Sequence, residues 1–219
     1  MKKYLKEAIL LVLIITPYIY LANIWQQLPN RVPTHFNFEG TADGWSDKNF
    51  LFFIPTGLGA FIYLLMLALP YIDPKKKIAQ MGEKHASLRF MLTVFFSLLS
   101  IYLLYATKEA GMKNPNLLIA LIGILLAMLG NYFQAVRPNY FIGIRTPWTL
   151  ESEDVWKKTH RLAGRLYVAG GVLITLLSFI INSIFALTVV FISIVVVMVL
   201  IPVVFSYTQY RKEKKIINQ

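Results

Sequence analysis

The sequence predicts an all-α membrane protein whose chain crosses the lipid bilayer six times. Three observations lead to this prediction: the excess of apolar residues, the length of the runs without a charged residue, and the placement of lysine and arginine. Hydrophobic residues make up 57% of the 219 positions and charged residues only 15%, whereas soluble domains are about 45–50% apolar and about 25% charged. A soluble fold of this size has too little interior to bury six entirely apolar helices.

The runs without a charged residue set the positions of the helices, since a helix that crosses a bilayer needs roughly 20 apolar residues. Four such runs precede Arg137, and a fifth, between Arg165 and Arg211, is long enough for two passes. Asn182 and Ser183, near the middle of the fifth run, suit a tight turn. We therefore expect spanning helices at residues 6–26, 50–72, 88–107, 115–136, 162–181 and 184–208.

The first of these runs begins like a signal peptide, with Lys2 and Lys3 before the apolar residues. The run is too long for a signal peptide, and Tyr20-Leu21-Ala22 lacks a small residue at the −3 position of a cleavage site. We expect the run to remain as the first span.

The net charge of +11 is explained by membrane topology. With six spans, 18 of the 22 lysines and arginines fall on the same side as the two chain ends. Loops on the cytoplasmic side carry an excess of these residues, so both termini are expected in the cytoplasm. This distribution makes the lipid bilayer the expected partner and argues against direct binding of nucleic acid. The chain has no cysteine, which excludes thiolate metal sites and disulfides and is compatible with a bacterial plasma membrane.

Along the chain we expect three parts: residues 1–72, two helices with an extracellular loop at 27–49; residues 73–114, the third helix with its flanking loops; and residues 115–219, three helices with a cytoplasmic loop at 137–161. Loops of this length are commonly functional or disordered, and both are too rich in Trp, Phe and Pro to be disordered.

The spans themselves suggest packing and no ion pathway. Gly123 and Ala127 form a small-xxx-small pair suited to close helix packing. No ionisable residue lies well inside a span, which argues against an ion-coupled transporter and most enzymes that act within the membrane. His85, in a loop on the cytoplasmic side, is expected to titrate in solvent.

The extracellular loop contains His35, Glu39, Asp43 and Asp47, which are spaced four residues apart. On a helix they would share one face and become weak candidates for a metal site, but the prolines and glycines of the loop make a helix improbable. A network of hydrogen-bonded turns is the plainer interpretation. The third is a peptide-recognition surface, for which the candidate residues are His35, Phe36, Asn37, Asp43 and Trp45.

The cytoplasmic loop is polar and aromatic, with Arg145 at its centre. Ser152 or Thr149 can cap a following amphipathic helix that continues into span five. One interpretation is an interfacial elbow with tryptophan anchors; the other is a docking surface for a cytoplasmic partner. Neither loop has a phosphate-binding glycine motif, a zinc-protease motif or a serine–histidine relay, so we expect no cofactor and no catalytic residue. The candidate residues for partner binding are Asn139, Gly143, Arg145, Thr146, Pro147, Trp148, Thr149 and Trp156.

Two segments resemble known families. Residues 139–150, NYFIGIRTPWTL, followed by Val155-Trp156, resemble the signature of the SdpI family, which is named for the immunity protein against the sporulation-delaying peptide toxin. Residues 28–45, with Leu28-Pro29, Pro33-Thr34-His35-Phe36, Gly40 and Asp43-Gly44-Trp45, resemble the N-terminal domain of unknown function often fused to it. The resemblance implies a six-helix membrane protein of Gram-positive bacteria that protects its producer from a secreted, membrane-active peptide. It also implies a signalling role, in which a transcriptional repressor is held at the membrane.

These features leave three functional hypotheses. The first is toxin immunity through binding, with the extracellular loop as the toxin site and the cytoplasmic loop as the signalling surface. The second is a sensor that captures a repressor without protecting the cell directly. The third is a metal-dependent membrane enzyme that uses His35 and the acidic residues of the extracellular loop.

Overall fold

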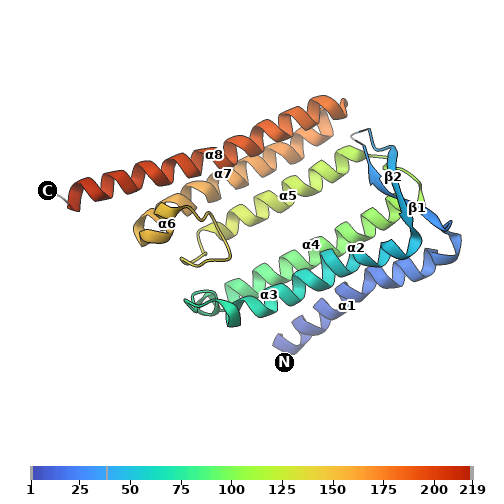
Figure 1. Cartoon of the computed structure of the whole chain (residues 1–219), viewed down its shortest axis with the longest axis horizontal. Helices are drawn as coiled ribbons and strands as arrows, with labels where there is room; N and C mark the ends of the chain where they lie inside the picture. Colours follow the sequence, from blue (N-terminus) through green and yellow to red (C-terminus); the bar gives the residue numbers. More distant parts are fainter. Residues whose placement is uncertain (1, 38, 218–219) are drawn as a thin grey trace. The chain divides into compact units, whose positions relative to one another are not determined.

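The computed structural model describes residues 2–37 and 39–217, which form helices with one small β-hairpin (Figure 1). The elements in chain order are α1 (Lys2–Ile24), η1 (Trp25–Gln27), β1 (Arg31–Phe36), β2 (Ala42–Asp47), η2 (Lys48–Phe52), α2 (Phe53–Pro55), η3 (Thr56–Ala60), α3 (Phe61–Ile72), η4 (Ala79–Met81), α4 (Glu83–Lys108), α5 (Pro115–Phe133), α6 (Pro147–Glu151), α7 (Glu153–Ile180) and α8 (Ile184–Ile217).

Six helical segments are long and apolar enough to cross a membrane, as the sequence predicts. They are Tyr4–Gln27, Lys48–Ile72, Glu83–Lys108, Pro115–Phe133, Glu153–Ile180 and Ile184–Ile216. The all-α, six-span fold class is thereby confirmed, and the chain is a multi-pass membrane protein. The cytoplasmic placement of the two termini stays a prediction.

The β-hairpin is an element that the sequence did not predict. β1 and β2 pair antiparallel from Arg31↔Asp47 to Phe36↔Ala42, with irregular register on either side of His35. Pro33 and Gly44 interrupt these short strands, and both residue types are rare inside regular strands. The alternation of apolar and polar residues that marks a strand is therefore too short to be recognised in the sequence.

The described residues form two compact units, Met1–Ala68 with Ala86–Pro115 and Leu69–His85 with Asn116–Gln219. The three-part division at residues 72 and 114 follows sequence order and stays a prediction. His85 is buried, with 7% of its surface exposed, so the prediction that it lies in solvent is wrong.

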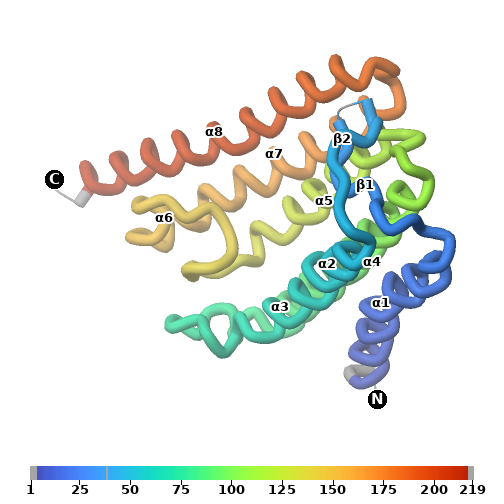
Figure 2. The backbone as a smooth tube through the Cα atoms, turned by 45° about the vertical axis from the view of Figure 1, so that its right-hand side comes forward, coloured from blue at the N-terminus to red at the C-terminus, as the bar shows by residue number. Residues whose placement is uncertain are grey.

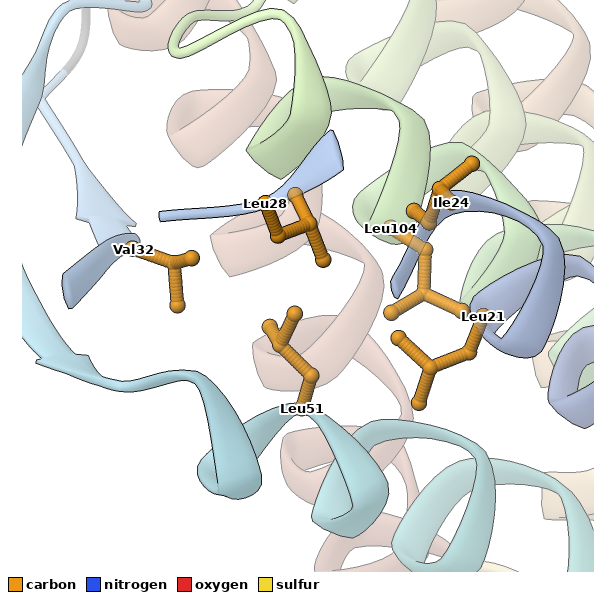
Figure 3. Close-up of a cluster of buried hydrophobic side chains, with 6 residues drawn as sticks. All are labelled: Leu21, Ile24, Leu28, Val32, Leu51 and Leu104. Carbon is orange, nitrogen blue, oxygen red and sulfur yellow. The ribbon is translucent and has the colours of Figure 1, made fainter. Parts of the chain in front are cut away.

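An apolar cluster and a partly buried ion pair are among the contacts that hold the first unit together. The cluster is shown in Figure 3 and consists of Leu21, Ile24, Leu28, Val32, Leu51 and Leu104. It joins the end of α1 to β1, η2 and α4, so the hairpin is fixed to the helices by burial of apolar surface. At the other end of α1, Glu7 pairs with Arg89 of α4 and accepts a hydrogen bond from the Tyr63 hydroxyl at 3.0 Å.

The second unit is built on close contact between α5 and α7. A Cβ added to Gly123 would fall 2.8 Å from the carbonyl oxygen of Gly171, and one added to Gly130 would fall 2.8 Å from that of Gly164. Only glycine permits backbones to approach this closely, as in small-xxx-small contacts between membrane helices. The helix packing predicted for Gly123 is confirmed. On another side of α7, α8 runs along the helix (Figures 1 and 2) and packs Met198 against Gly170.

Candidate functional site

Asn139 holds the loop between α5 and α6 in one conformation. Its side chain is fully buried and uses all four of its hydrogen-bonding positions. The Nδ2 group donates to the carbonyls of Arg137 and Ile142, at 2.7 and 3.1 Å, and Oδ1 accepts from the backbone N–H groups of Phe141 and Ile142, at 2.7 Å each. A buried amide with every position satisfied fixes the local backbone. Asn139 is therefore part of the loop's framework.

Thr146 and Thr149 form a capping box at the start of α6. The Thr146 side chain accepts from the Thr149 N–H at 3.2 Å, and Thr149 Oγ1 accepts from the Thr146 N–H at 2.9 Å. Pro147 occupies the first turn, where its missing N–H has no helical partner to lose. Thr149 Oγ1 also contacts the Ile144 carbonyl at 2.9 Å. These contacts show that the residues Thr-Pro-Trp-Thr form the N-terminal cap of a helix.

Trp156 and His160, on the first turns of α7, form the buried floor of this loop. The Trp156 indole N–H donates to the Val136 carbonyl at 2.8 Å, and its ring stacks on His160 with centroids 4.1 Å apart. His160 Nδ1 donates to the Trp156 carbonyl at 2.9 Å, and Nε2 accepts from the Ile144 N–H at 3.0 Å. The two contacts specify one tautomer of the neutral imidazole. Neither ring nitrogen of His160 is left for a metal or a substrate.

Gly143 allows the loop to approach this floor. Its φ is +110°, and an added Cβ would overlap His160 Nε2. A residue with a side chain is therefore excluded here both by the backbone conformation and by the lack of space.

The short helix α6 packs against the last turns of α8. Thr146 Oγ1 lies 3.1 Å from Ser206 Oγ, the Trp148 ring lies 4.9 Å from that of Tyr207, and the Ser152 hydroxyl donates to Glu213 at 2.7 Å. The bend between α6 and α7 is visible in Figure 2. At this bend Ser152 accepts from the Val155 N–H at 3.2 Å and so caps α7, one of the two predicted caps.

An exposed ion pair also joins α6 to α8. Lys214 Nζ lies 3.3 Å from Glu151 Oε1. Hydrogen bonds from Tyr210 and Lys214 stabilise the ionised carboxylate and hold the pKa of Glu151 below its ordinary value.

The eight residues predicted for partner binding therefore fall into two groups. Asn139, Thr146, Thr149 and Trp156 are buried, and Gly143 lies against His160. Arg145 and Pro147 are exposed, and Trp148 is partly exposed over Tyr207. The Arg145 guanidinium donates to the Tyr140 carbonyl, and Tyr140 and Phe141 beside it are exposed. The outward surface of this loop, residues 140–148, thus presents Arg145 and Pro147 among aromatic residues.

In the first unit, Asn37 and Gly40 shape the turn of the hairpin. Asn37 Oδ1 accepts from the N–H groups of Glu39 and Thr41, both at 3.0 Å. Gly40 has φ +82°, and its carbonyl accepts from the Met112 N–H at 2.9 Å. Asn37 is thus a turn residue, as the hydrogen-bonded-turn interpretation expects.

The hairpin is fastened to the end of α4. The Thr107 hydroxyl donates to the Pro33 carbonyl at 3.2 Å, and Thr41 forms an isolated bridge with Gly111. Together with Val32, which is completely buried, these contacts make the hairpin a fixed platform.

On the exposed face of the hairpin, His35 and Asp43 lie side by side. His35 Nδ1 is 2.5 Å from Asp43 Oδ1, and the two side chains are 74% and 44% exposed. Gly44 permits the two strands to approach closely at His35, since a Cβ added to Gly44 would fall 2.7 Å from the Cβ of His35. Trp45 is 48% exposed, and Phe36 is half-buried.

The four predicted metal candidates do not come together as a set. Asp43 contacts His35, whereas Asp47 accepts from the Asn49 N–H at 2.8 Å and caps the next turn. Within residues 2–37 and 39–217, no three His, Asp or Glu side chains are placed to share a metal ion.

Sequence reasoning missed the partners of α6 on α8, namely Ser206, Tyr207, Tyr210, Glu213 and Lys214. Their signal is the length of the last helix, which continues to Ile217, well past the predicted end of the span at residue 208.

Comparisons with known proteins give matches to the two parts of the chain that contain these loops. Residues 135–208 match the model of the SdpI/YfhL protein family, and residues 12–59 match a domain of unknown function (DUF1648). The chain is also 29% identical over 208 residues to a Bacillus subtilis (strain 168) protein called Immunity protein SdpI, covering 94% of this chain and 97% of that protein. No solved structure matches the chain. The predicted resemblance is confirmed for both segments.

Proposed function

Because this membrane protein carries the SdpI/YfhL family region together with the DUF1648 region, we propose that it is an immunity protein, which protects its cell from a secreted, membrane-active peptide toxin. The observation that supports this most is the alignment with Immunity protein SdpI over 94% of the chain. The alignment includes both loops and all six spans, so the comparison concerns the whole arrangement and not one motif.

The hairpin is the surface proposed to bind the toxin. On the predicted topology it faces the outside, where a secreted peptide arrives. Membrane-active amphipathic helices carry apolar side chains on one face and Lys or Arg on the other. The hairpin exposes the Trp45 ring beside the carboxylates of Asp43 and Asp47, and these suit the two faces of such a peptide. His35 completes the exposed group, whereas Phe36 is half-buried and Asn37 shapes the turn of the hairpin.

Fixation of the hairpin favours recognition. A bound peptide loses conformational freedom on binding, and a receptor that is already ordered adds little further entropic cost. The contacts of Val32 and Pro33 with the helices of the first unit, and of Gly40 with Met112 after α4, provide this order.

Survival of a toxin-sensitive bacterium tests the proposal. Cells that express the chain, with membrane insertion confirmed by fractionation, are expected to survive a concentration of purified toxin that kills cells with an empty vector. Unchanged killing despite confirmed insertion would contradict immunity.

The second candidate function is capture of a cytoplasmic repressor, and the loop at 140–148 favours it. The loop is rigidly built yet presents Arg145, Tyr140 and Phe141 outward, and arginine and aromatic residues are enriched where proteins bind one another. We propose this surface as the repressor site.

Arg145→Ala is the variant suited to this test, because its side chain is exposed. Trp156→Ala is unsuitable, since Trp156 is fully buried and its loss would collapse the loop. Arg145→Ala is expected to abolish toxin-induced transcription of the chain's own gene and to leave survival intact, while Lys215→Ala behaves like the wild type. If Arg145→Ala lost both survival and toxin-induced transcription, the loop would be needed for protection as well as for signalling.

A further inference from the structure

Arg161 and Arg165 lie one helical turn apart on an exposed face of α7. The same face continues through Val168, Val172 and Leu176, whose side chains are 38%, 47% and 56% exposed. Exposed apolar side chains along a spanning helix contact acyl chains. The two guanidinium groups therefore stand at one end of a lipid-facing stripe.

These two arginines differ from the other arginines of the second unit. Arg137 donates to Gln80 Oε1 at 2.8 Å, Arg145 donates to the Tyr140 carbonyl, and Arg211 lies 5.9 Å from the centroid of the Tyr207 ring. Within the described part of the chain, Arg161 and Arg165 have no ion pair, hydrogen bond or ring contact.

The lysines one turn earlier on α7 are neutralised within the helix. Lys157 pairs with Glu153 at 3.2 Å and Lys158 with Asp154 at 2.7 Å, as the spacing predicts. No acid follows on α7 to do the same for Arg161 and Arg165. Two like charges at this spacing destabilise a helix, so an anion from outside the chain would relieve the repulsion.

The depth of the pair matches the headgroup layer. At about 1.5 Å per residue, Arg165 lies roughly 22 Å along α7 from the exposed Ile180 at the other end of the span. A hydrocarbon core is about 30 Å thick, so the Arg165 backbone enters its edge and the side chain reaches out to the phosphates. Arg161 lies one turn nearer to water.

We propose that Arg161 and Arg165 bind the phosphate of an anionic phospholipid in the leaflet next to α6. Guanidinium groups make paired hydrogen bonds to phosphate oxygens, which an ammonium group does not. A zwitterionic lipid brings its own cation close to two guanidinium groups that α7 leaves without an acidic partner, whereas an anionic lipid does not. The inference is independent of the immunity function, since it concerns lipid and not toxin.

Native mass spectrometry of the full-length protein, released from detergent with phosphatidylglycerol or phosphatidylcholine, tests the proposal. The wild type is expected to retain phosphatidylglycerol in preference to phosphatidylcholine. Each basic residue near an anionic surface contributes about 1 kcal/mol, so Arg161→Gln/Arg165→Gln is expected to weaken this retention roughly thirtyfold. The matched control Lys212→Gln/Lys215→Gln removes the same charge from exposed residues of α8 and is expected to retain phosphatidylglycerol like the wild type.

Three results would overturn the proposal. The first is a wild type that does not discriminate between the two lipids, a result that needs no variant to fold. The second is retention by Arg161→Gln/Arg165→Gln at the wild-type level. The third is an equal loss in the α8 control, which would assign the effect to overall charge.

Discussion

The imidazole Nε2 of His160 accepts a hydrogen bond from the backbone N–H of Ile144 at 3.0 Å, which joins α7 to the centre of the loop that precedes α6. Through this bond, His160 supports the backbone of the loop. It also explains the glycine next to Ile144, because no other residue brings the loop so near the ring.

Gly143→Ala is expected to destabilise the protein by about 2 kcal/mol or more, since alanine meets His160 and strains a backbone with positive φ. Thermal unfolding in detergent measures this. The control is Gly57→Ala, because no heavy atom lies within 4 Å of an added Cβ at Gly57. Equal stability of the two variants would show that the loop does not pack on His160.

Gly171→Ala is expected to separate α5 from α7. The added methyl group would overlap the backbone of Ala127 and Gly123, and the backbone cannot move aside as a flexible side chain can. Overpacking of this kind costs about 1–3 kcal/mol, which a lower midpoint of thermal unfolding would report. Gly59→Ala, with open space around its added Cβ, is the matched control, and a Gly171→Ala midpoint equal to it would refute the close contact.

The ion pair of Glu151 predicts a pH dependence. Hydrogen bonds from Tyr210 and Lys214 lower the pKa of Glu151 in the folded protein below its ordinary value of 4.5. A lowered pKa means that the stabilisation is complete above the unfolded value and is lost as pH falls through the folded value. The difference in unfolding midpoint between wild type and Glu151→Gln should therefore be small, because the pair is exposed, but present at pH 7 and progressively smaller as the pH falls below 4.5. A Glu151→Gln difference that persists unchanged at low pH would exclude this origin.

The sequence predicted the six spans because an apolar run of sufficient length has only one stable conformation in lipid. It did not predict the hairpin, since Pro33 and Gly44 mask its two short strands. The sequence identified the two loops as candidate sites, but it did not show which of their residues hold the loop in shape and which face outward. Asn139 and Thr149 look as polar as Arg145 in sequence, and only their buried hydrogen bonds show that they hold the loop and do not face a partner.

Binding of purified, fluorescently labelled toxin to the protein in lipid nanodiscs tests the central claim most directly. The wild type is expected to bind with saturation, and Trp45→Ala is expected to bind roughly thirtyfold or more weakly, since an aromatic anchor at the centre of an interface commonly contributes about 2 kcal/mol or more. The control Phe185→Ala, which removes an aromatic side chain that is 75% exposed at the start of α8, should bind like the wild type. No saturable binding by the wild type, or binding by Trp45→Ala at full strength, would contradict toxin capture by the hairpin.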